Sequence, residues 1–207
     1  MTAGLARSTA TCRAIKSRTL KVRIKPQERS GHLLIPDSDS RGPSGKMMMI
    51  NKPEAVITVL ENAPAIIVPL AREVPEAVLK RRPQPHKWSA HEHACHLAEV
   101  HQLFFSRLEL MLREERPTIK AYKPDEAMEE GALLKVDFHE ALERFTRDRA
   151  RLVEEPKDLS EDDWLREAEH EEYKHYSVLI MFRHVALHDM LHAYRIEELL
   201  LKRDWAD

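Results

Sequence analysis

The chain has 207 residues, which is enough for one domain with a sizeable core and some further sequence. No run approaches the about 18 to 20 apolar residues of a membrane span, and Cys12 and Cys95 lack the spacing of a disulfide framework or a metal site, so we expect a reduced, cytoplasmic protein without a membrane segment. Residues 1–46 carry 10 basic and 3 acidic side chains while the remainder carries 23 and 32, and a domain with a net charge of −9 is a poor candidate for binding nucleic-acid phosphates.

Residues 1–46 form a basic leader that we predict to be disordered. The segment has few large apolar side chains, many Arg, Ser and Pro, and no helical period, so it cannot offset the entropy of ordering its backbone. Its composition resembles that of a transit peptide, but it lacks a clean amphipathic stretch. The run Met47, Met48 and Met49 raises the alternative hypothesis that the natural start lies there. The predicted globular domain spans residues 47–207.

The domain is predicted to be all-α. The whole chain has only 5 glycines, and no segment after Pro53 shows the alternation of a strand. A first helix is expected from Pro53 to about Arg72, with a break or kink at Pro64 and Pro69. The prolines around residues 75 and 83–85 then mark a connection.

A second helix begins at Ser89, because Ser89 and Glu92 match a capping box and Trp88 before them is placed for a hydrophobic staple. This helix is expected to end near Pro117. A third helix is expected over about 137–155 and a fourth over about 177–202. Their apolar positions recur at helical spacing, so four amphipathic helices can close one bundle. The predicted core positions on these three helices are Leu97, Val100, Phe104, Leu108, Met111, Phe138, Ala141, Leu142, Phe145, Leu152, Val178, Met181, Val185, Ile196 and Leu199.

Three histidines on the predicted inward faces form a candidate metal site. His188 and His192 lie four residues apart, so their side chains stack on one face of the last helix, the face that also carries Val185 and Ile196. His96 lies on the inward side of the second helix. If these two helices pack together, three neutral nitrogen ligands converge and leave coordination positions open, which is the pattern of a catalytic metal site.

The alternative interpretation is that these residues are ordinary core histidines whose ring nitrogens bond to nearby polar groups. The other histidines are weaker candidates for metal ligands. His91 and His101 point toward polar positions and are expected to be exposed, while His93 and His184 flank the predicted ligands and are candidates for supporting residues or spare ligands.

Other motifs match known sites incompletely. The stretch from His188 to His192 imitates the metalloprotease motif His-Glu-x-x-His, but Asp189 replaces the longer Glu base, so a protease is disfavoured. Residues 167–170 and 172–175 both read Glu-x-x-His, as in di-iron bundles, but they share one connecting segment and are expected to form a charged, solvated loop. Glu92 is a possible general base, although the capping box already explains it.

The pattern Trp-Ser-x-x-Glu-x-x-x-His-Leu over residues 88–97, followed by His-Asp-x-x-His over 188–192, resembles the DinB-like superfamily of damage-inducible four-helix proteins. The resemblance extends from about Asn51 to Leu201. It implies a four-helix bundle with an up-down-down-up arrangement and a metal site for zinc, nickel or iron, with His96, His188 and His192 as ligands. It also implies a possible homodimer.

The resemblance leaves several functions open. Some members are transferases that use a low-molecular-weight thiol as cosubstrate and some are metal-dependent hydrolases, so we expect a small-molecule substrate, with thiol transfer favoured over hydrolysis by analogy alone. The alternative is a non-catalytic metal-binding module of a stress response. Nucleic-acid binding fits the acidic domain poorly, since only the basic leader could support it.

Overall fold

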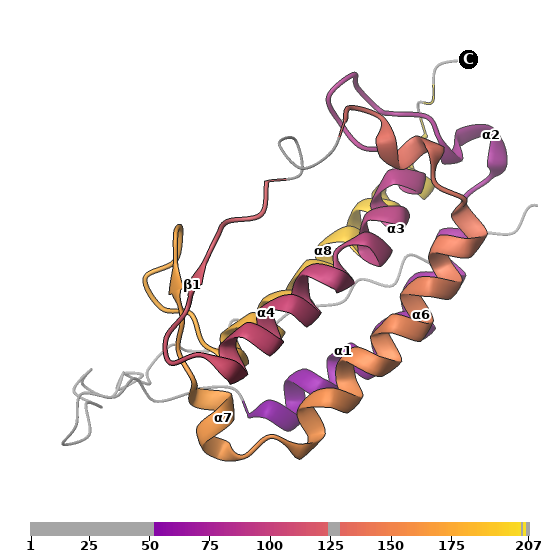
Figure 1. The fold of residues 1–207 in the computed structure, drawn as a ribbon. Coiled ribbons are helices and arrows are strands. Elements are labelled where there is room, and N and C mark those ends of the chain that lie inside the picture. The colour runs from indigo at the N-terminus through magenta and orange to yellow at the C-terminus, as the bar shows by residue number, and fades with distance from the viewer. Residues whose placement is uncertain (1–51, 124–128, 204, 206–207) are drawn as a thin grey trace, which may run out of the picture. The chain divides into compact units, whose positions relative to one another are not determined.

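The computed structural model describes residues 52–123, 129–203 and 205. The predicted basic leader, residues 1–46, and the three methionines that follow it lie outside the described residues. The described part of the chain is mostly helical, which confirms the all-α prediction (Figure 1). The four long bundle segments are α1 (Pro53–Glu73), α3 with α4 (Ala90–Glu99 and His101–Arg113), α6 (Phe138–Glu154) and α8 (Val178–Leu200).

Short elements connect these helices. Two of them are strands of two residues each, which pair in parallel, with Thr118 opposite Glu169 and Ile119 opposite His170. The sequence did not predict them, because two residues are too few to show an alternating pattern. The pairing joins the connection after α4 to the connection before α8. The short elements are α2 (Glu76–Leu79), β1 (Thr118–Ile119), η1 (Ala132–Lys135), η2 (Glu155–Asp158), α7 (Glu161–Leu165) and β2 (Glu169–His170).

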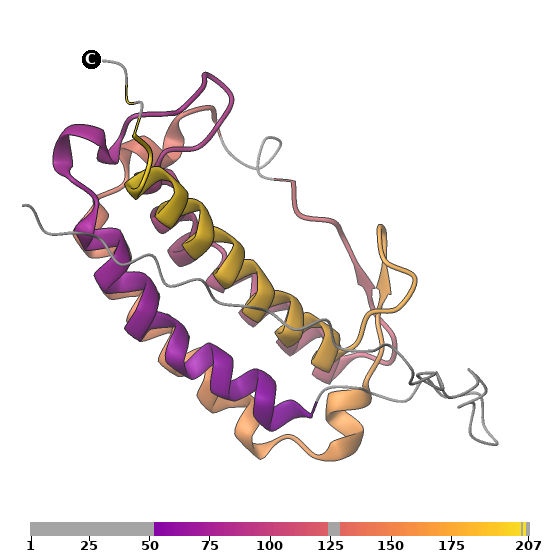
Figure 2. The ribbon, with the colours of Figure 1, turned by 180° about the vertical axis from the view of Figure 1, so that it is seen from behind.

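The helices run up, down, down and up, as the family resemblance implies. Helix α1 leads from the α7 end of the bundle to the α2 end, α3 and α4 return, and α6 runs in the same direction as α4 (Figures 1 and 2). Helix α8 then runs parallel to α1. Because α4 and α6 are parallel, the chain between them must cross back along the bundle, and η1 at the end of this crossover contacts α3.

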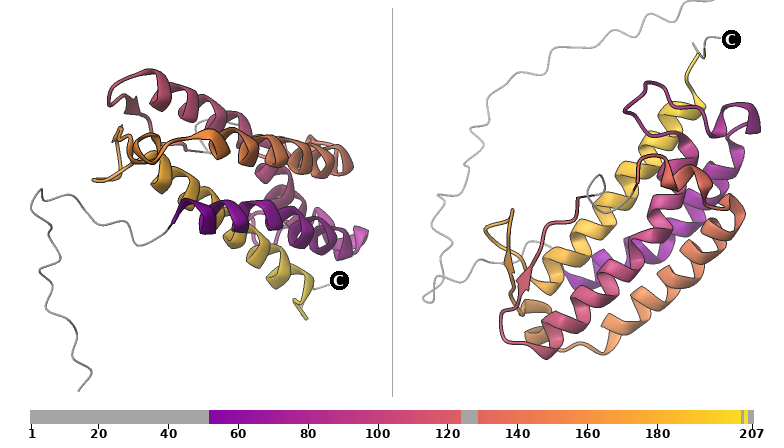
Figure 3. Two further views of the ribbon diagram at one scale, coloured as in Figure 1. Left: turned by 90° about the horizontal axis from the view of Figure 1, so that it is seen from below. Right: turned by 45° about the horizontal axis from the view of Figure 1, so that its top comes forward.

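The two walls α1 and α3 each pack mainly against α6 and α8. Helix α1 contacts α6 and α8, and α3 contacts the same two helices from the opposite side (Figure 3). The predicted core positions on α3, α4 and α8 are all buried, and Phe138 on α6 is partly buried. A helix with two neighbours buries a wide face, which is wider than the single stripe that an apolar pattern reveals.

Helix α1 is one continuous helix through Pro64 and Pro69, so of the predicted break or kink the break is absent. Each proline removes one helical hydrogen bond and crowds a carbonyl group, which costs about 3 kcal/mol or more. Burial of the apolar face offsets this cost. By length and composition, α1 would also pass as a membrane span, but in the bundle its inner side belongs to the core. The buried residues of α1 are Val56, Leu60, Ala63, Ile67 and Ala71.

The second segment is one helix in the sequence prediction and two in the structure, α3 and α4. They meet at Val100, whose backbone remains in the right-handed helical region. The Val100 amide donates to the carbonyl of His96, and the Phe104 amide donates to the carbonyl of Val100. The two helices therefore continue in one direction and act as one wall of the bundle.

Candidate metal centre

His96 of α3 and His188 and His192 of α8 meet where these two helices pack together. The Nε2 atom of His188 lies 3.1 Å from the Nε2 atom of His96 and 3.1 Å from that of His192. One nitrogen of each ring lies within 4.8 Å of the other two. The convergence predicted from the sequence is therefore present in the structure.

The spacing of these nitrogens suits a shared divalent ion. Two nitrogens that each lie about 2.0–2.1 Å from one ion are roughly 2.8–3.4 Å apart at octahedral to tetrahedral angles. Three imidazoles also leave positions for a substrate or a nucleophile, whereas a closed structural site uses four protein ligands. The donor set and its geometry thus fit an open zinc, nickel or iron site.

Burial keeps the rings of His96 and His192 in the neutral form that a metal requires. His96 is 2% exposed and His192 is 7% exposed. Desolvation lowers the pKa of His96 to about 3, and it also lowers the pKa of His192, with the neighbouring imidazoles adding to both effects. A neutral imidazole offers a lone pair at neutral pH, so no proton has to be displaced from these two rings.

His93 and Trp88 support the ligand rings. The Nδ1 atom of His93 lies 2.8 Å from the Nδ1 atom of His192, so a hydrogen bond between them fixes the orientation of the His192 ring. Burial lowers the pKa of His93 to about 4. The Trp88 ring packs against His93, as expected of a hydrophobic staple, and also lies 4.8 Å from the ring of His96 and 5.9 Å from that of His192.

The three ligands open onto a cavity of about 280 Å³. Its walls are mainly aromatic, and Tyr122 from the crossover packs against the ring of His96. Burial raises the pKa values of Tyr122 and Tyr176, so both phenols keep their protons at neutral pH. The aromatic residues of the cavity are Trp88, Phe104, Tyr122, Tyr173 and Tyr176.

The connection before α8 is mostly exposed, as predicted for a charged loop, and it also forms part of the cavity wall. His170 and Glu172 both line the cavity. The His170 ring lies 4.6 Å from the rings of Tyr173 and Tyr176, and burial lowers its pKa. The two Glu-x-x-His matches in this segment do not build a di-iron site on facing helices, since residues 166–177 are not helical. The sequence signal for this part of the cavity wall was the concentration of aromatic side chains in an otherwise acidic connection.

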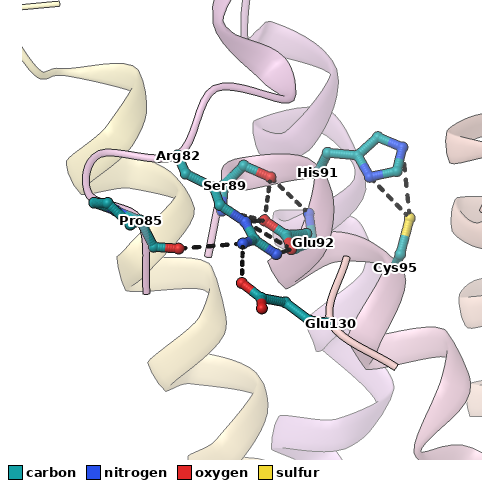
Figure 4. Close-up of polar contacts among 7 residues, drawn as sticks. All are labelled: Arg82, Pro85, Ser89, His91, Glu92, Cys95 and Glu130. Atoms are coloured by element: carbon teal, nitrogen blue, oxygen red, sulfur yellow. Dashed lines mark hydrogen bonds and ion pairs between the residues drawn. The ribbon is translucent and has the colours of Figure 1, made fainter. Parts of the chain in front are cut away.

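His91 and His101 are buried, so the prediction that they are exposed was wrong. His91 stacks on Phe138 of α6, and the Sγ atom of Cys95 lies 3.6 Å from its Nδ1 atom (Figure 4). His101 accepts a hydrogen bond from the Nε atom of Arg149 at 3.2 Å. The error arose because α3 and α4 pack against α6 as well as α8, so positions off the apolar stripe also face protein.

Asp189 forms an ion pair with Arg149 inside the bundle, at 2.7 Å between Oδ2 and Nη2, and both side chains are at most 1% exposed. The other carboxylate oxygen lies 3.9 Å from the Nδ1 atom of His188, beyond hydrogen-bonding distance. This carboxylate is therefore committed to Arg149 and is not a base in the cavity. His184, one turn before His188, does line the cavity.

Glu92 has a structural role. Its carboxylate accepts hydrogen bonds from the backbone N–H and the hydroxyl of Ser89, both at 2.9 Å, and is clasped by the guanidinium of Arg82 (Figure 4). Burial opposes ionisation of Glu92, but the bonds from Arg82 and Ser89 outweigh it and lower the pKa. The predicted capping box is confirmed. Because its carboxylate is bonded to Ser89 and Arg82, Glu92 is not available as a general base.

Comparisons with known proteins agree with this geometry. The family model described as the DinB superfamily matches residues 60–196. Among solved structures, YfiT from Bacillus subtilis superposes with a TM-score of 0.66 at 22% sequence identity, covering 74% of this chain and 90% of YfiT. YfiT is described as a probable metal-dependent hydrolase with an unusual four-helix bundle topology. Comparison with curated protein sequences gives no match.

Proposed function

The chain belongs to the DinB superfamily, and from that premise we propose that it is a metal-dependent enzyme acting on a small organic molecule, with hydrolysis as the first candidate reaction. The observation that carries the proposal is the convergence of three Nε2 atoms at a cavity large enough for a small molecule. The description of YfiT as a metal-dependent hydrolase supports the choice of reaction.

The residues around the cavity have distinct roles in this proposal. His96, His188 and His192 would hold the ion, and His93 would keep the His192 ring in place. When bound, a divalent ion would supply Lewis acidity that polarises an electrophile or lowers the pKa of a nucleophile.

Burial lowers the pKa values of His170 and His184, so both rings are neutral at neutral pH. A neutral imidazole has a free nitrogen that can accept a proton. The phenols of Tyr122 and Tyr176 can donate hydrogen bonds to a substrate oxygen. The aromatic walls would exclude water from the rest of the substrate.

Transfer of a low-molecular-weight thiol remains the alternative reaction, because a thiol and a water molecule can use the same open position.

The experiment compares hydrolysis and thiol transfer on one preparation of the protein loaded with zinc, nickel or iron. A panel of esters and amides tests hydrolysis, and conjugation of a model electrophile with bacillithiol, mycothiol or glutathione tests transfer. His192→Ala should abolish either activity. His139→Ala, on the exposed side of α6, should leave it unchanged.

The outcomes separate the candidate functions. Turnover of an ester or amide supports hydrolysis, and turnover only with a thiol replaces hydrolysis by transfer. If the loaded protein binds metal but turns over neither panel, the non-catalytic metal-binding module becomes the better account. In that case bound metal should still raise the melting temperature by ligand linkage.

A further inference from the structure

Arg107 is the one lysine or arginine among the described residues that line the cavity. It projects from α4, and its guanidinium is held from two sides. The Nη2 atom donates to the carbonyl of Lys120 at 2.6 Å, and the Nη1 atom donates to the hydroxyl of Tyr176 at 3.3 Å. The crossover after β1 and the connection before α8 thus fix this cation at the cavity wall.

Both acceptors of Arg107 are neutral. No carboxylate in the described part of the chain forms an ion pair with it, whereas the guanidinium of Arg149 faces Asp189 and that of Arg82 faces Glu92. A guanidinium has five N–H donors, and the two bonds to Lys120 and Tyr176 use only part of them. A half-buried positive charge therefore faces the cavity, and the described residues give it no counter-ion.

The other ionisable groups of the cavity do not cancel this charge. His170 and His184 are neutral at neutral pH, because burial and the positive charge of Arg107 lower their pKa values. Glu172 is the one acidic side chain of the described cavity lining, and it is exposed, so water screens it. The cavity thus combines aromatic walls, one fixed cation and three converging imidazoles.

We propose that Arg107 binds the carboxylate or phosphate group of the substrate. A guanidinium matches either oxyanion through parallel hydrogen bonds, and the aromatic walls suit an apolar or aromatic body beside it. The reactive group of the same molecule then faces His96, His188 and His192. This inference rests on the proposed function, and it narrows the substrate class to small organic acids or phosphate compounds.

The test measures binding of simple probes to the full-length protein by calorimetry or by ligand-observed NMR. Phenylacetate and benzylphosphonate carry the two oxyanions, and phenylacetamide is their neutral counterpart. Each is titrated into the wild type and into Arg107→Met, Arg107→Lys and Arg113→Met variants, with metal and after chelation. Arg113 is an exposed arginine of α4 outside the cavity lining, so Arg113→Met controls for the loss of one positive charge from the same helix. Circular dichroism checks that each variant is folded.

We expect Arg107→Met to weaken binding of at least one anionic probe by roughly ten- to a hundredfold. Arg107→Lys should fall between the wild type and Arg107→Met, and Arg113→Met should stay close to the wild type. Binding of phenylacetamide should be the same in all variants. The preferred anion identifies the carboxylate or the phosphate as the natural group.

Anion binding that is equal in the wild type and Arg107→Met would overturn the inference, because the probe would then be held by another group such as the ion. If Arg107→Met does not fold, the same equality between the wild type and Arg107→Lys would overturn it. The chelated samples separate this inference from the proposed function. Anion binding that depends on Arg107 and persists without metal supports the subsite even if the protein fails as a metal enzyme.

Discussion

Asp189 and Arg149 place opposite charges in the bundle interior, directly beside the candidate metal ligand His188. Each charge is costly to bury alone, and each is tolerated because the other lies 2.7 Å away. The pair joins α8 to α6, and Arg149 also donates to His101 on α4. One buried guanidinium therefore links three walls of the bundle near the candidate metal centre.

Replacing Asp189 by Asn should lower the free energy of unfolding by about 3–5 kcal/mol, because it leaves Arg149 charged and unpaired. Urea denaturation measures the loss. The exposed pair of Arg195 and Glu198 provides the control, since Glu198→Gln should change stability by less than about 1 kcal/mol. A small effect of Asp189→Asn would show that the ion pair does not hold the helices together.

His101 should make the protein sensitive to acid. Burial and the charge of Arg149 lower its pKa to about 3, so in the folded state it stays neutral while the unfolded chain takes up a proton below about 6.5. The free energy of unfolding should therefore fall as the pH falls from about 6.5 toward 3. Above about pH 6.5 the contribution of His101 to stability should be fully present.

The His101→Gln variant tests this claim, since an amide oxygen can still accept the bond from Arg149. Between about pH 7.5 and pH 5, the chelated variant should lose up to about 2 kcal/mol less stability than the chelated wild type. Identical pH profiles of unfolding would mean that His101 is not held neutral.

Single residues differ in how far the sequence predicts them. His188 and His192 were predictable because their spacing and their apolar neighbours define one inward face. Arg149 and Asp189 were not, because a charged residue in a helix is normally exposed and its buried partner lies 40 positions away. Arg107 was missed for a similar reason, since the groups that hold it and part of the cavity wall come from connections between the helices.

At the scale of elements, side-chain caps fix where the helices begin. Ser89 starts α3, Asp137 starts α6 and Ser177 starts α8, and each accepts a hydrogen bond from a backbone amide three residues later. The sequence predicted the start at Ser89 from its capping box, because a cap is local chemistry, and it placed the other two starts from the apolar pattern. It did not predict β1 with β2, whose pairing depends on where the crossover passes.

The cap of α3 should contribute more to stability than the similar capping box of α7, because Ser89 is buried and Ser160 is exposed. We expect Ser89→Ala to cost about 1–2 kcal/mol and to loosen the site, since Glu92 loses a partner. Ser160→Ala should cost about 0.5 kcal/mol. Thermal melting compares the two variants, and equal losses would contradict a special role for the buried cap.

At the scale of the whole molecule, the lengths of the connections decide the directions of the helices. The long crossover between α4 and α6 lets these two helices run in the same direction. The sequence predicts four helices, but their order up, down, down and up came from the family resemblance. Periodicity cannot show that α4 and α6 are parallel neighbours, because it reports which face of a helix is buried and not which helix covers it.

The homodimer implied by the resemblance stays a prediction. Large apolar side chains are exposed along α8 at Leu187, Leu191 and Tyr194 and along α1 at Val59 and Ile66, and these two helices pack side by side. We predict that this surface joins two copies. Light scattering should give twice the chain mass for the wild type and the single mass for Leu191→Glu. A wild-type protein with the mass of a single chain would contradict the predicted homodimer.

The metal content of the purified full-length protein tests the central claim most directly. We predict about one zinc, nickel or iron ion per chain in the wild type and in His184→Ala, which removes a cavity histidine one turn from His188, and less than about a tenth of that in a folded His188→Ala variant. A wild type without metal after exposure to each ion, or a His188→Ala variant that keeps its full content, would contradict a metal centre built from these three histidines.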